Sequence, residues 1–458
     1  MNRGLYSAPM KLRTQPLSLL LFVICTLALT SSVFALDRQA GADYRARRVA
    51  LSKTLNGGML VLFAGMESEG PNALYGFRQD NNFFYLTGWA EPGAAVVIAP
   101  AVEAKDKVVA RPYSEVLFLP AHNSTQEKWT GPKLGADDPK AAEVTGFDRV
   151  ATLDQMREVL LQVVPQPRAV IYSALGQAPE NTPSTIPLEW LKRSNAFPIV
   201  SILDASDKIA ELRKHKDRGE IERIRHATDA SIAGHFAAMK AMRPGLFEYQ
   251  IAALMQYKFQ DGGCERPAYA PIVGSGFYST VLHYSEDSHE IRDGDVVVMD
   301  VAGEYGMYAS DITRTLPANG HFTARQREVY NVVLGAQQAV MQSVVAGKSM
   351  LTGRDENSLY RIAYEYINTH GKDLHGEPLG KYFIHGLGHR VGLEVHDVGE
   401  GPVDKGDVFT VEPGIYIPEE KIGVRIEDIV MLDENGKLVN LTASLPHTAD
   451  DVESAMRK

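Results

Sequence analysis

Val296-Val-Val-Met-Asp300 and Asp311-Ile-Thr-Arg-Thr315 are the two stretches that decide the fold of the second half of this chain. The first is an apolar run of strand composition that ends in a carboxylate, a group that is costly to bury without a partner. A return through a two-residue turn at Tyr305-Gly306 would place Asp311 opposite Asp300, where cross-strand Cβ atoms lie roughly 4.5–5.5 Å apart. Two carboxylates that close repel each other unless a cation lies between them, so this hairpin predicts a metal site.

A second hairpin repeats the arrangement closer to the C-terminus. Glu412 ends a run of strand composition, residues 408–412, and Glu427 lies in another, residues 423–430. A turn centred on Glu419-Glu420 would pair the two glutamates. One divalent ion cannot balance four carboxylates, whereas two ions can, so the sequence predicts a binuclear site with the metals roughly 3.5–4 Å apart. A bulge or a longer loop would shift either pairing, and a single acid on a strand is more often a solvent-facing carboxylate or a cap.

Three histidines lie in the segment Phe383-Ile-His385-Gly-Leu-Gly-His389-Arg-Val-Gly-Leu-Glu-Val-His396-Asp397. His385 and His389 are four residues apart, a spacing that forms a zinc pair on a helix. The three glycines disfavour a helix, however, and the Glu of the His-Glu-x-x-His motif is missing. Each histidine alone could be a structural residue with its hydrogen bonds satisfied. As a cluster they indicate one metal ligand with partners that handle protons.

Length and composition favour two domains in an ordinary globular protein. The 458 residues exceed what one hydrophobic core usually organises, and 45% are apolar and 23% charged. Residues 36–207 alternate short apolar runs with stretches of helical composition, which predicts an amino-terminal α/β domain. Residues 208–458 begin with a helical pattern and continue with strand pairs. The net charge of −10 argues against a nucleic-acid partner, since neutralising phosphates needs clustered Lys and Arg.

The first residues have the three-part pattern of a secretory signal. Three basic residues precede the apolar stretch at residues 17–29, and small residues for cleavage follow, ending at Ala35. We therefore expect residues 1–35 to be a signal peptide, and the mature protein to be periplasmic or secreted. An uncleaved anchor is the alternative, although the apolar run is short for a bilayer, which needs about 20 residues. Cleavage leaves Cys264 as the one cysteine, and a buried, inert thiol is favoured over a catalytic one.

The motifs around these acids and histidines together resemble the pita-bread metallopeptidases, a family that includes methionine aminopeptidase, prolidase, creatinase and Xaa-Pro aminopeptidase. In the amino-terminal half, Phe77-Arg-Gln-Asp-Asn-Asn-Phe-Phe-Tyr-Leu-Thr-Gly-Trp-Ala-Glu-Pro92 is similar to the Xaa-Pro aminopeptidase (aminopeptidase P) branch. The resemblance spans roughly residues 40–440. It implies an α/β amino-terminal domain followed by an α+β pita-bread catalytic domain.

The resemblance also assigns metal ligands. Asp300 would chelate one metal, and His389 with Glu412 would chelate the other. Asp311 and Glu427 would bridge the two. One imidazole among mostly oxygen ligands suits a hard ion, so Mn²⁺ is the expected metal, with Co²⁺ or Zn²⁺ able to substitute.

Further site residues are implied in the same way. His283, His385 and His396 would line the substrate site as catalytic groups, and Tyr416 and Arg425 would bind substrate. Glu412 would add to its ligand role by moving a proton from the attacking water to the leaving nitrogen. Residue 390 is Arg where relatives often carry a bulky apolar group, which leaves the substrate contacts near this position open.

The implied reaction is release of the amino-terminal residue from peptides whose second residue is proline, by a hydroxide that bridges two divalent metals. A prolidase that accepts only Xaa-Pro dipeptides is the alternative within enzymes. A non-catalytic binding module is the alternative outside them, although such modules have lost the ligands that stand here. The resemblance further implies a homo-oligomer, a dimer or tetramer, in which the amino-terminal domain of one subunit, around Trp89, closes a neighbour's site.

Overall fold

The computed structural model describes residues 38–67, 75–103, 110–163, 170–175 and 201–457. The predicted signal peptide, residues 1–35, lies outside these ranges. Within them, no helix combines the length and the apolar character needed to span a lipid bilayer. Residues 38–458 form one compact unit, so the predicted domain boundary near residue 207 stays a prediction.

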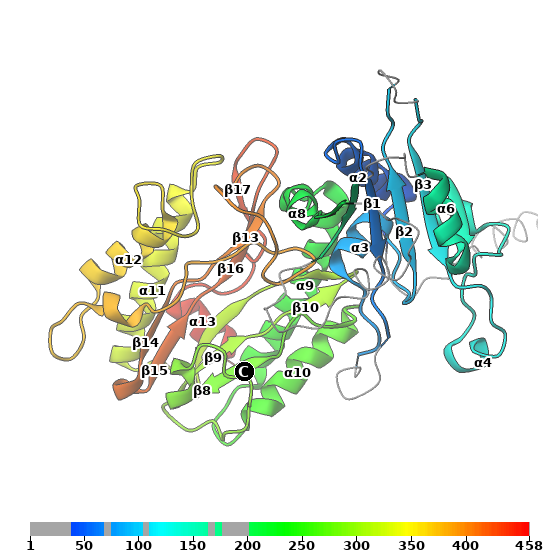
Figure 1. Ribbon diagram of the computed structural model, residues 1–458. Coiled ribbons are helices and arrows are strands. Elements are labelled where there is room, and N and C mark those ends of the chain that lie inside the picture. The colour runs from blue at the N-terminus through cyan, green and yellow to red at the C-terminus, as the bar shows by residue number, and fades with distance from the viewer. Residues whose placement is uncertain (1–37, 68–74, 104–109, 164–169, 176–200, 458) are drawn as a thin grey trace, which may run out of the picture. The chain divides into compact units, whose positions relative to one another are not determined.

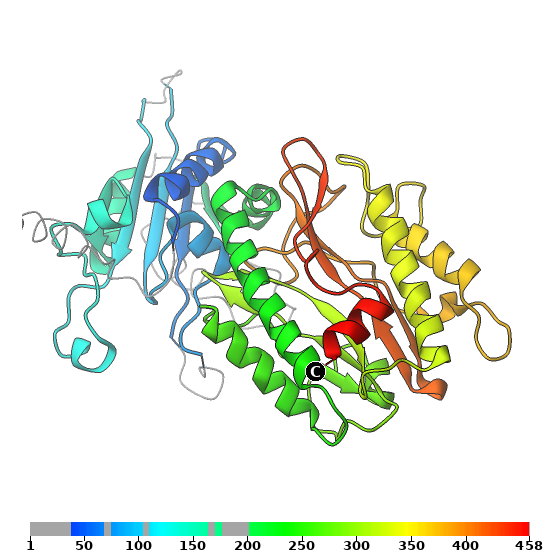
Figure 2. The same cartoon turned by 180° about the vertical axis from the view of Figure 1, so that it is seen from behind.

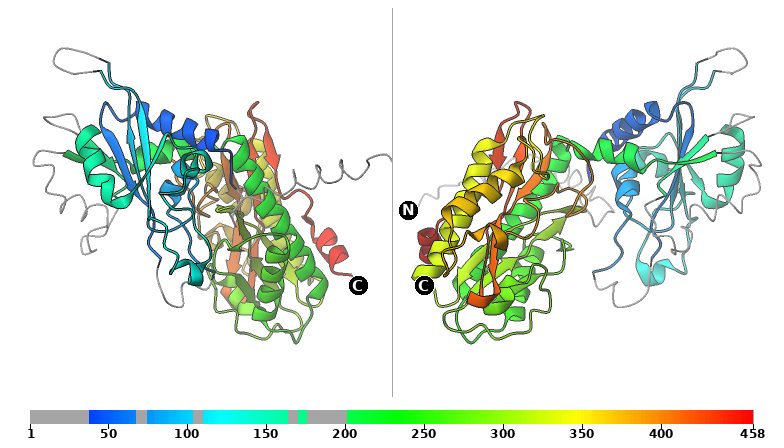
Figure 3. Two further views of the ribbon diagram at one scale, coloured as in Figure 1. Left: turned by 90° about the vertical axis from the view of Figure 1, so that its right-hand side faces the viewer. Right: turned by 60° about the vertical axis from the view of Figure 1, so that its left-hand side comes forward.

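The N-terminal part is built on one mixed sheet with the strand order β4-β3-β2-β1-β5-β6. Met59 and Val61 of β1 point to one face, where they pack with Leu160 of α6 (Met156–Val163). Helix α2 (Gly41–Lys53) lies on the opposite face (Figure 3). The predicted strands are therefore confirmed, and helices cover both faces. The remaining elements of this part are β1 (Met59–Phe63), β2 (Ala95–Ala99), β3 (Ser114–Leu119), β4 (Arg149–Thr152), β5 (Val170–Ser173), β6 (Ser201–Asp204), α3 (Asn81–Thr87), α4 (Glu127–Thr130) and α5 (Ala141–Thr145).

Helices and antiparallel strands form separate layers in the C-terminal part. Helix α9 (Arg218–Ala241) starts at a capping box, in which Asp217 and Glu220 each accept the other's backbone N–H. Figure 2 shows this helix in front of the strands, beside other helices of the same layer. The other helices of this part are α8 (Ser206–Lys214), α10 (Glu248–Asp261), α11 (Ala324–Ser343), α12 (Leu359–His370) and α13 (Ala449–Met456).

The first predicted acid hairpin forms, but its register differs from the prediction. Strands β9 (Val296–Asp300) and β12 (Thr313–Pro317) pair so that Asp300 lies opposite Thr313, and not opposite Asp311. The reason is the turn between β10 and β11, whose central residues are Gly306 and Met307, with φ of 56° and 74°. A tight hairpin turn with two central residues at positive φ has its centre one residue later than predicted.

The second acid hairpin keeps the predicted centre between residues 419 and 420. Strand β13 (Val408–Val411) pairs with β16 (Asp428–Leu432), and β14 (Gly414–Ile417) pairs with β15 (Ile422–Arg425). Both pairs have their centre between residues 419 and 420. The prediction of one continuous strand over residues 423–430 was wrong, because the chain leaves the ladder at Ile426 and Glu427.

A missing hydrogen-bond donor and one hydrogen bond to another strand account for the break between β15 and β16. Pro413, on the facing strand, has no N–H to donate to a ladder. The backbone N–H of Glu427 turns instead to the carbonyl of Thr313, at 3.1 Å, so it joins the two acid hairpins. Figure 1 labels β9 of the first hairpin and β13 to β16 of the second. The other strands of this part are β7 (Arg266–Pro267), β8 (Ile272–Ser275), β10 (Gly303–Tyr305), β11 (Tyr308–Ala309) and β17 (Leu438–Asn440).

Candidate metal centre

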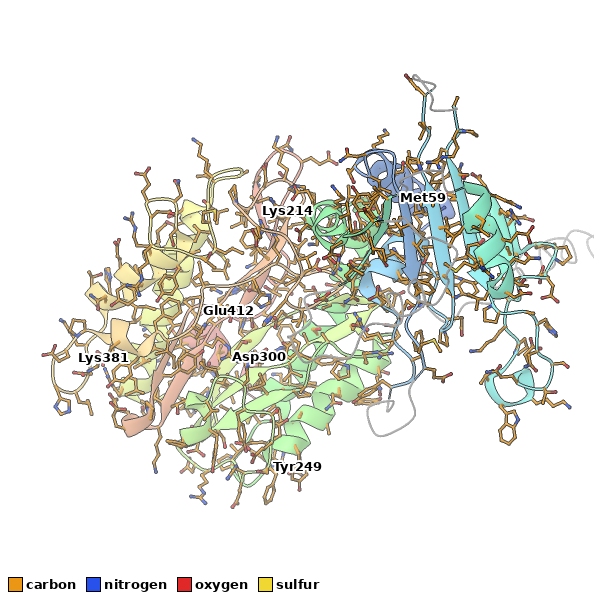
Figure 4. The ribbon with its side chains drawn as sticks, in the orientation of Figure 1. Met59, Lys214, Tyr249, Asp300, Lys381 and Glu412 are labelled. Carbon is orange, nitrogen blue, oxygen red and sulfur yellow. The ribbon has the colours of Figure 1, made fainter. Side chains whose placement is uncertain are left out.

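A cavity of about 440 Å³ in the C-terminal part collects most of the residues singled out in the sequence. Asp300 and Glu412, labelled in Figure 4, reach it from the ends of β9 and β13. Neither the two hairpins nor the histidine segment supplies the cavity alone, so it forms only when all three come together. Its charged and imidazole-bearing lining residues are Asp300, Asp311, Glu412, Glu427, His283, His385, His389, His396 and Arg425.

The five predicted ligands all reach this cavity. The Nε2 atom of His389 lies 3.3 Å from Asp311 Oδ2 and 3.3 Å from Glu412 Oε1. One ligand atom each of Asp311, His389 and Glu427 lies within 4.8 Å of the others. Asp300 lies near Asp311 because one tyrosine hydroxyl bonds to both of them. The wrong register on the first hairpin therefore did not separate its two acids.

Crowding of like charges is visible in the pKa values of these acids. Burial, the hydrogen bond from His389 and the charge of Asp300 together leave the pKa of Asp311 raised to about 6. Burial raises the pKa of Glu427 well above its usual value, and the charges of Asp311 and Glu412 add to that rise. Burial is the main cause of both shifts, and the neighbouring carboxylates add to it, whereas His389 lowers the pKa of Glu412.

This donor set fits a pair of divalent cations. Asp311 and Glu427 are almost fully buried, at 5% and 1% exposure, where like charges repel strongly. A cation placed between such groups would remove the repulsion that raises their pKa values. Four carboxylates with one imidazole form an oxygen-rich set, which suits Mn²⁺ better than a thiolate-selecting metal.

Two residues that the sequence analysis did not single out hold the acids in place. The hydroxyl oxygen of Tyr269 lies 2.6 Å from Asp300 Oδ1 and 2.7 Å from Asp311 Oδ1, so the two carboxylates share its single proton as hydrogen-bond acceptors. The hydroxyl of Thr313 donates to Glu427 Oε2 at 2.6 Å. Tyr269 has no local pattern around it that would reveal this role. Thr313 could have been found from the correct register, because it is the residue opposite Asp300.

The predicted substrate residues form a hydrogen-bonded chain along one side of the cavity. Arg425 donates from Nη2 to Asp300 Oδ2 at 2.6 Å and from Nη1 to the Tyr416 hydroxyl at 2.9 Å. The same hydroxyl lies 2.8 Å from His385 Nε2. Tyr416 is buried and is not among the lining residues, so its contact with the cavity passes through its two partners. Arg425 lies opposite Gly414, whose missing side chain leaves room for the tyrosine hydroxyl.

His283 and His396 also line the cavity, and the His396 ring centroid lies 4.0 Å from that of His389. Arg390 lies elsewhere: it is buried, pairs with Asp407 at 2.9 Å and donates to three loop carbonyls. Its side chain therefore takes no part in lining the cavity.

Two residues outside the site are also placed. Cys264 is a buried, free thiol whose pKa burial raises to about 12, so the interpretation of an inert thiol holds. Trp89 is 3% exposed and lines a cavity of about 100 Å³ in the N-terminal part, so the expectation that the region around it closes a neighbour's site stays a prediction. Of the two tryptophans that the structure describes in the N-terminal part, Trp129 on α4 is the exposed one, at 86% exposure.

Comparison with known proteins gives the same result for both halves. Residues 222–434 match the model of metallopeptidase family M24, and residues 44–172 match that of the aminopeptidase P N-terminal domain. The chain is 34% identical to the Xaa-Pro aminopeptidase of Escherichia coli, over 90% of this chain and 97% of that protein. It is 33% identical to the Xaa-Pro aminopeptidase of Haemophilus influenzae, over 87% and 93%.

A solved structure agrees with these sequence matches. The proline aminopeptidase P II of Yersinia pestis superimposes with a TM-score of 0.77 at 32% identity, covering 91% of this chain and 99% of that one. Fold and site together define a metallo-exopeptidase with an amino-terminal α/β domain and a pita-bread catalytic domain. Within that class, the chain belongs to the Xaa-Pro aminopeptidase branch of family M24.

Proposed function

We propose that this protein releases the amino-terminal residue from peptides whose second residue is proline, with two divalent metal ions at the cavity. The observation that carries the proposal is the convergence of four carboxylates and one imidazole on one cavity, beside three further histidines. The relatives named Xaa-Pro aminopeptidase support the substrate class.

The five ligands divide between two ions. Asp300 would hold one ion and His389 with Glu412 the other, while Asp311 and Glu427 would hold both. When bound, two such ions lower the pKa of a water between them, which supplies a hydroxide nucleophile at neutral pH. Mn²⁺ is the proposed ion, because oxygen ligands predominate.

Side chains of the cavity perform the remaining steps. Glu412 takes the proton of the attacking water and delivers it to the leaving nitrogen as the C–N bond breaks. His396 donates a hydrogen bond to the scissile carbonyl oxygen, where negative charge develops. His283, on the same wall, assists the proton transfer.

The preference for proline has a physical basis in the imide nitrogen. This nitrogen has no hydrogen to donate, and the ring fixes the backbone angle φ, so the residue needs a shaped pocket. We assign that pocket to His385 and Arg425, with Tyr416 holding both in place.

Hydrolysis of two short peptides tests the proposal. Purified protein with Mn²⁺ should release alanine from Ala-Pro-Ala, and a chelator should abolish the release. Asp300→Ala should lower the rate by more than about 100-fold, beyond what losing an outer partner of a metal ligand typically causes. The exposed Asp293→Asn serves as the matched control. Activity that survives both chelator and Asp300→Ala would end the two-metal proposal, and cleavage of Ala-Pro alone would favour a prolidase.

We also propose a homo-oligomer, a dimer or tetramer. Trp129 gives a test of this part, because its indole is 86% exposed and aromatic side chains are enriched in subunit contacts. Trp129→Ser should shift the elution volume toward a smaller species if the indole lies at the subunit contact. An unchanged oligomer would place the contact elsewhere.

Export is proposed from the signal pattern alone. The mature protein should begin just after Ala35 and be found in the periplasm or outside the cell. Amino-terminal sequencing of the protein from its native host decides this, since an uncleaved anchor would leave residues 1–35 in place.

A further inference from the structure

The segment Arg78-Gln-Asp-Asn-Asn82 of the N-terminal part has no role in the proposed reaction, yet three of its side chains point to the catalytic part. Arg78 and Asn81 reach residues 391–398, which we call the His396 loop, and Asn82 reaches Arg213, which in turn bonds to that loop. Arg78 donates from Nη2 to the carbonyl of Leu393 at 2.6 Å, and its Nε holds Glu304 at 2.8 Å. Arg78 therefore bonds to two separate segments of the catalytic part, the His396 loop and β10.

Asn81 adds a second contact to the same loop. Its Nδ2 donates to Glu394 Oε1 at 2.8 Å, and Arg213 Nη2 donates to the same oxygen at 3.2 Å. Asn82 accepts from Arg213 Nη1 at 2.7 Å. The N-terminal segment therefore both touches the loop and orients the arginine that holds it.

Asp397 is the strongest of the loop's attachment points. Its Oδ1 accepts from Arg213 Nη2 at 2.5 Å, and its Oδ2 lies 2.9 Å from Lys216 Nζ. All three side chains are at most 2% exposed, so the group is shielded from solvent. Charge-assisted bonds in such surroundings fix geometry strongly. A Cβ at Gly392 would lie 2.1 Å from Asp397 Oδ2, which shows how closely the loop folds over this carboxylate.

His396 precedes Asp397 directly and has no such attachment of its own. Its imidazole lines the cavity, and it makes no hydrogen bond to any residue in the part of the chain that the structure describes. Apart from its ring contact with His389, the direction of the imidazole therefore depends on the backbone of the loop. The loop is held through the backbone carbonyl of Leu393 and through the side-chain carboxylates of Glu394 and Asp397.

We propose that Arg78, Asn81, Asn82, Arg213 and Lys216 form a brace that positions the His396 imidazole. The brace makes the N-terminal part a contributor to catalysis within its own chain. This inference rests on the proposed function, in which His396 donates to the carbonyl oxygen. A displacement of about 1 Å at such a group can cost about 100-fold in rate.

A purely structural ion-pair cluster would also be buried and fully bonded. Weakening such a cluster would lower the stability of the protein, but the effect on the rate would not depend on the His396 imidazole. The two interpretations therefore differ in how a brace variant combines with a His396 variant.

A double-mutant cycle separates them. Arg213→Lys keeps a positive charge near Asp397. It removes the guanidinium group, whose two terminal nitrogens also bond to Asn82 and Glu394. We expect kcat on Ala-Pro-Ala to fall about 10- to 100-fold with KM within about threefold. In a His396→Ala background, the same change should lower kcat by less than about twofold. Asn82→Ala is the second variant, for which we expect a smaller loss with the same non-additivity.

The matched control is Arg325→Gln, which breaks a pair with Glu420 at 2.7 Å outside the cavity and should be neutral in both backgrounds. Hydrogen exchange gives a readout that needs no activity: amides of residues 391–398 should exchange faster in Arg213→Lys than in wild type. The brace would be overturned if the kcat losses of Arg213→Lys and His396→Ala multiplied in the double variant. It would also be overturned if hydrogen exchange of residues 391–398 were unchanged in Arg213→Lys. A wild-type protein that does not turn over would count against the proposed function, and exchange would still decide the brace.

Discussion

His235 is a fully buried histidine on α9, outside the metal centre. Its Nε2 lies 3.0 Å from the carbonyl of Val301, and burial lowers its pKa to about 3, with the nearby charge of Arg314 adding to the effect. The unfolded imidazole binds a proton below about pH 6.5, whereas the folded one does so only below about pH 3. The unfolded state therefore binds more protons throughout this window.

The free energy of unfolding should accordingly fall as the pH is lowered from 6.5 to 3. The contribution of one such group is at most about 1.4 kcal/mol per pH unit. His235→Gln keeps a donor for the carbonyl and has no proton to gain. Urea unfolding of both proteins at fixed Mn²⁺ should give curves that converge toward acid pH. Parallel curves would show that His235 is not held neutral.

At the same scale, the sequence identified charged and imidazole residues better than neutral ones. Asp300 and Glu412 were predicted because each is a carboxylate at the end of an apolar run. His385 and His389 were singled out because they lie in a glycine-rich segment. The roles of His283 and His396 came from the family resemblance. Tyr269 and Thr313 are ordinary residues for a loop and a strand, and their importance comes only from partners that are far away in sequence.

Between elements, the buried pair of Arg314 and Asp428 joins β12 to β16. The two side chains are fully buried and 2.7 Å apart. Breaking a buried pair leaves an uncompensated charge, which typically costs about 3–5 kcal/mol. Asp428→Asn should therefore lower the free energy of unfolding by that amount. Glu222→Gln, which breaks the exposed pair with Arg218, should change it by less than about 0.5 kcal/mol. Equal effects in urea titrations would contradict this ranking.

The hairpins show why elements were easier to predict than their register. Strand positions follow from apolar periodicity, but the pairing depends on which residues take the turn. The prediction chose Tyr305-Gly306, while the turn uses Gly306 and Met307, a non-glycine residue at positive φ. In a regular strand, a shift of two residues in the partner leaves the facing side unchanged, so the error did not remove Asp311 from the site.

For the whole molecule, the five ligands come from elements spread over more than a hundred residues, so metal binding and stability must be linked. An ion that binds only the folded state raises the free energy of unfolding, by about 4 kcal/mol at a thousandfold excess over Kd. Without metal, the same carboxylates repel one another, as the raised pKa values of Asp311 and Glu427 indicate.

These two effects have opposite signs and can be separated with one variant. Glu427→Gln removes a ligand and also a source of repulsion. With a chelator, its melting temperature should therefore equal or exceed that of the wild type, and with excess Mn²⁺ the wild type should be the more stable. The control Glu420→Gln, outside the cavity, should keep the wild-type response to metal. If neither chelator nor Mn²⁺ changes the melting temperature of the wild type, the folded acids do not share a metal. An ion that binds only the folded state would have to raise that temperature.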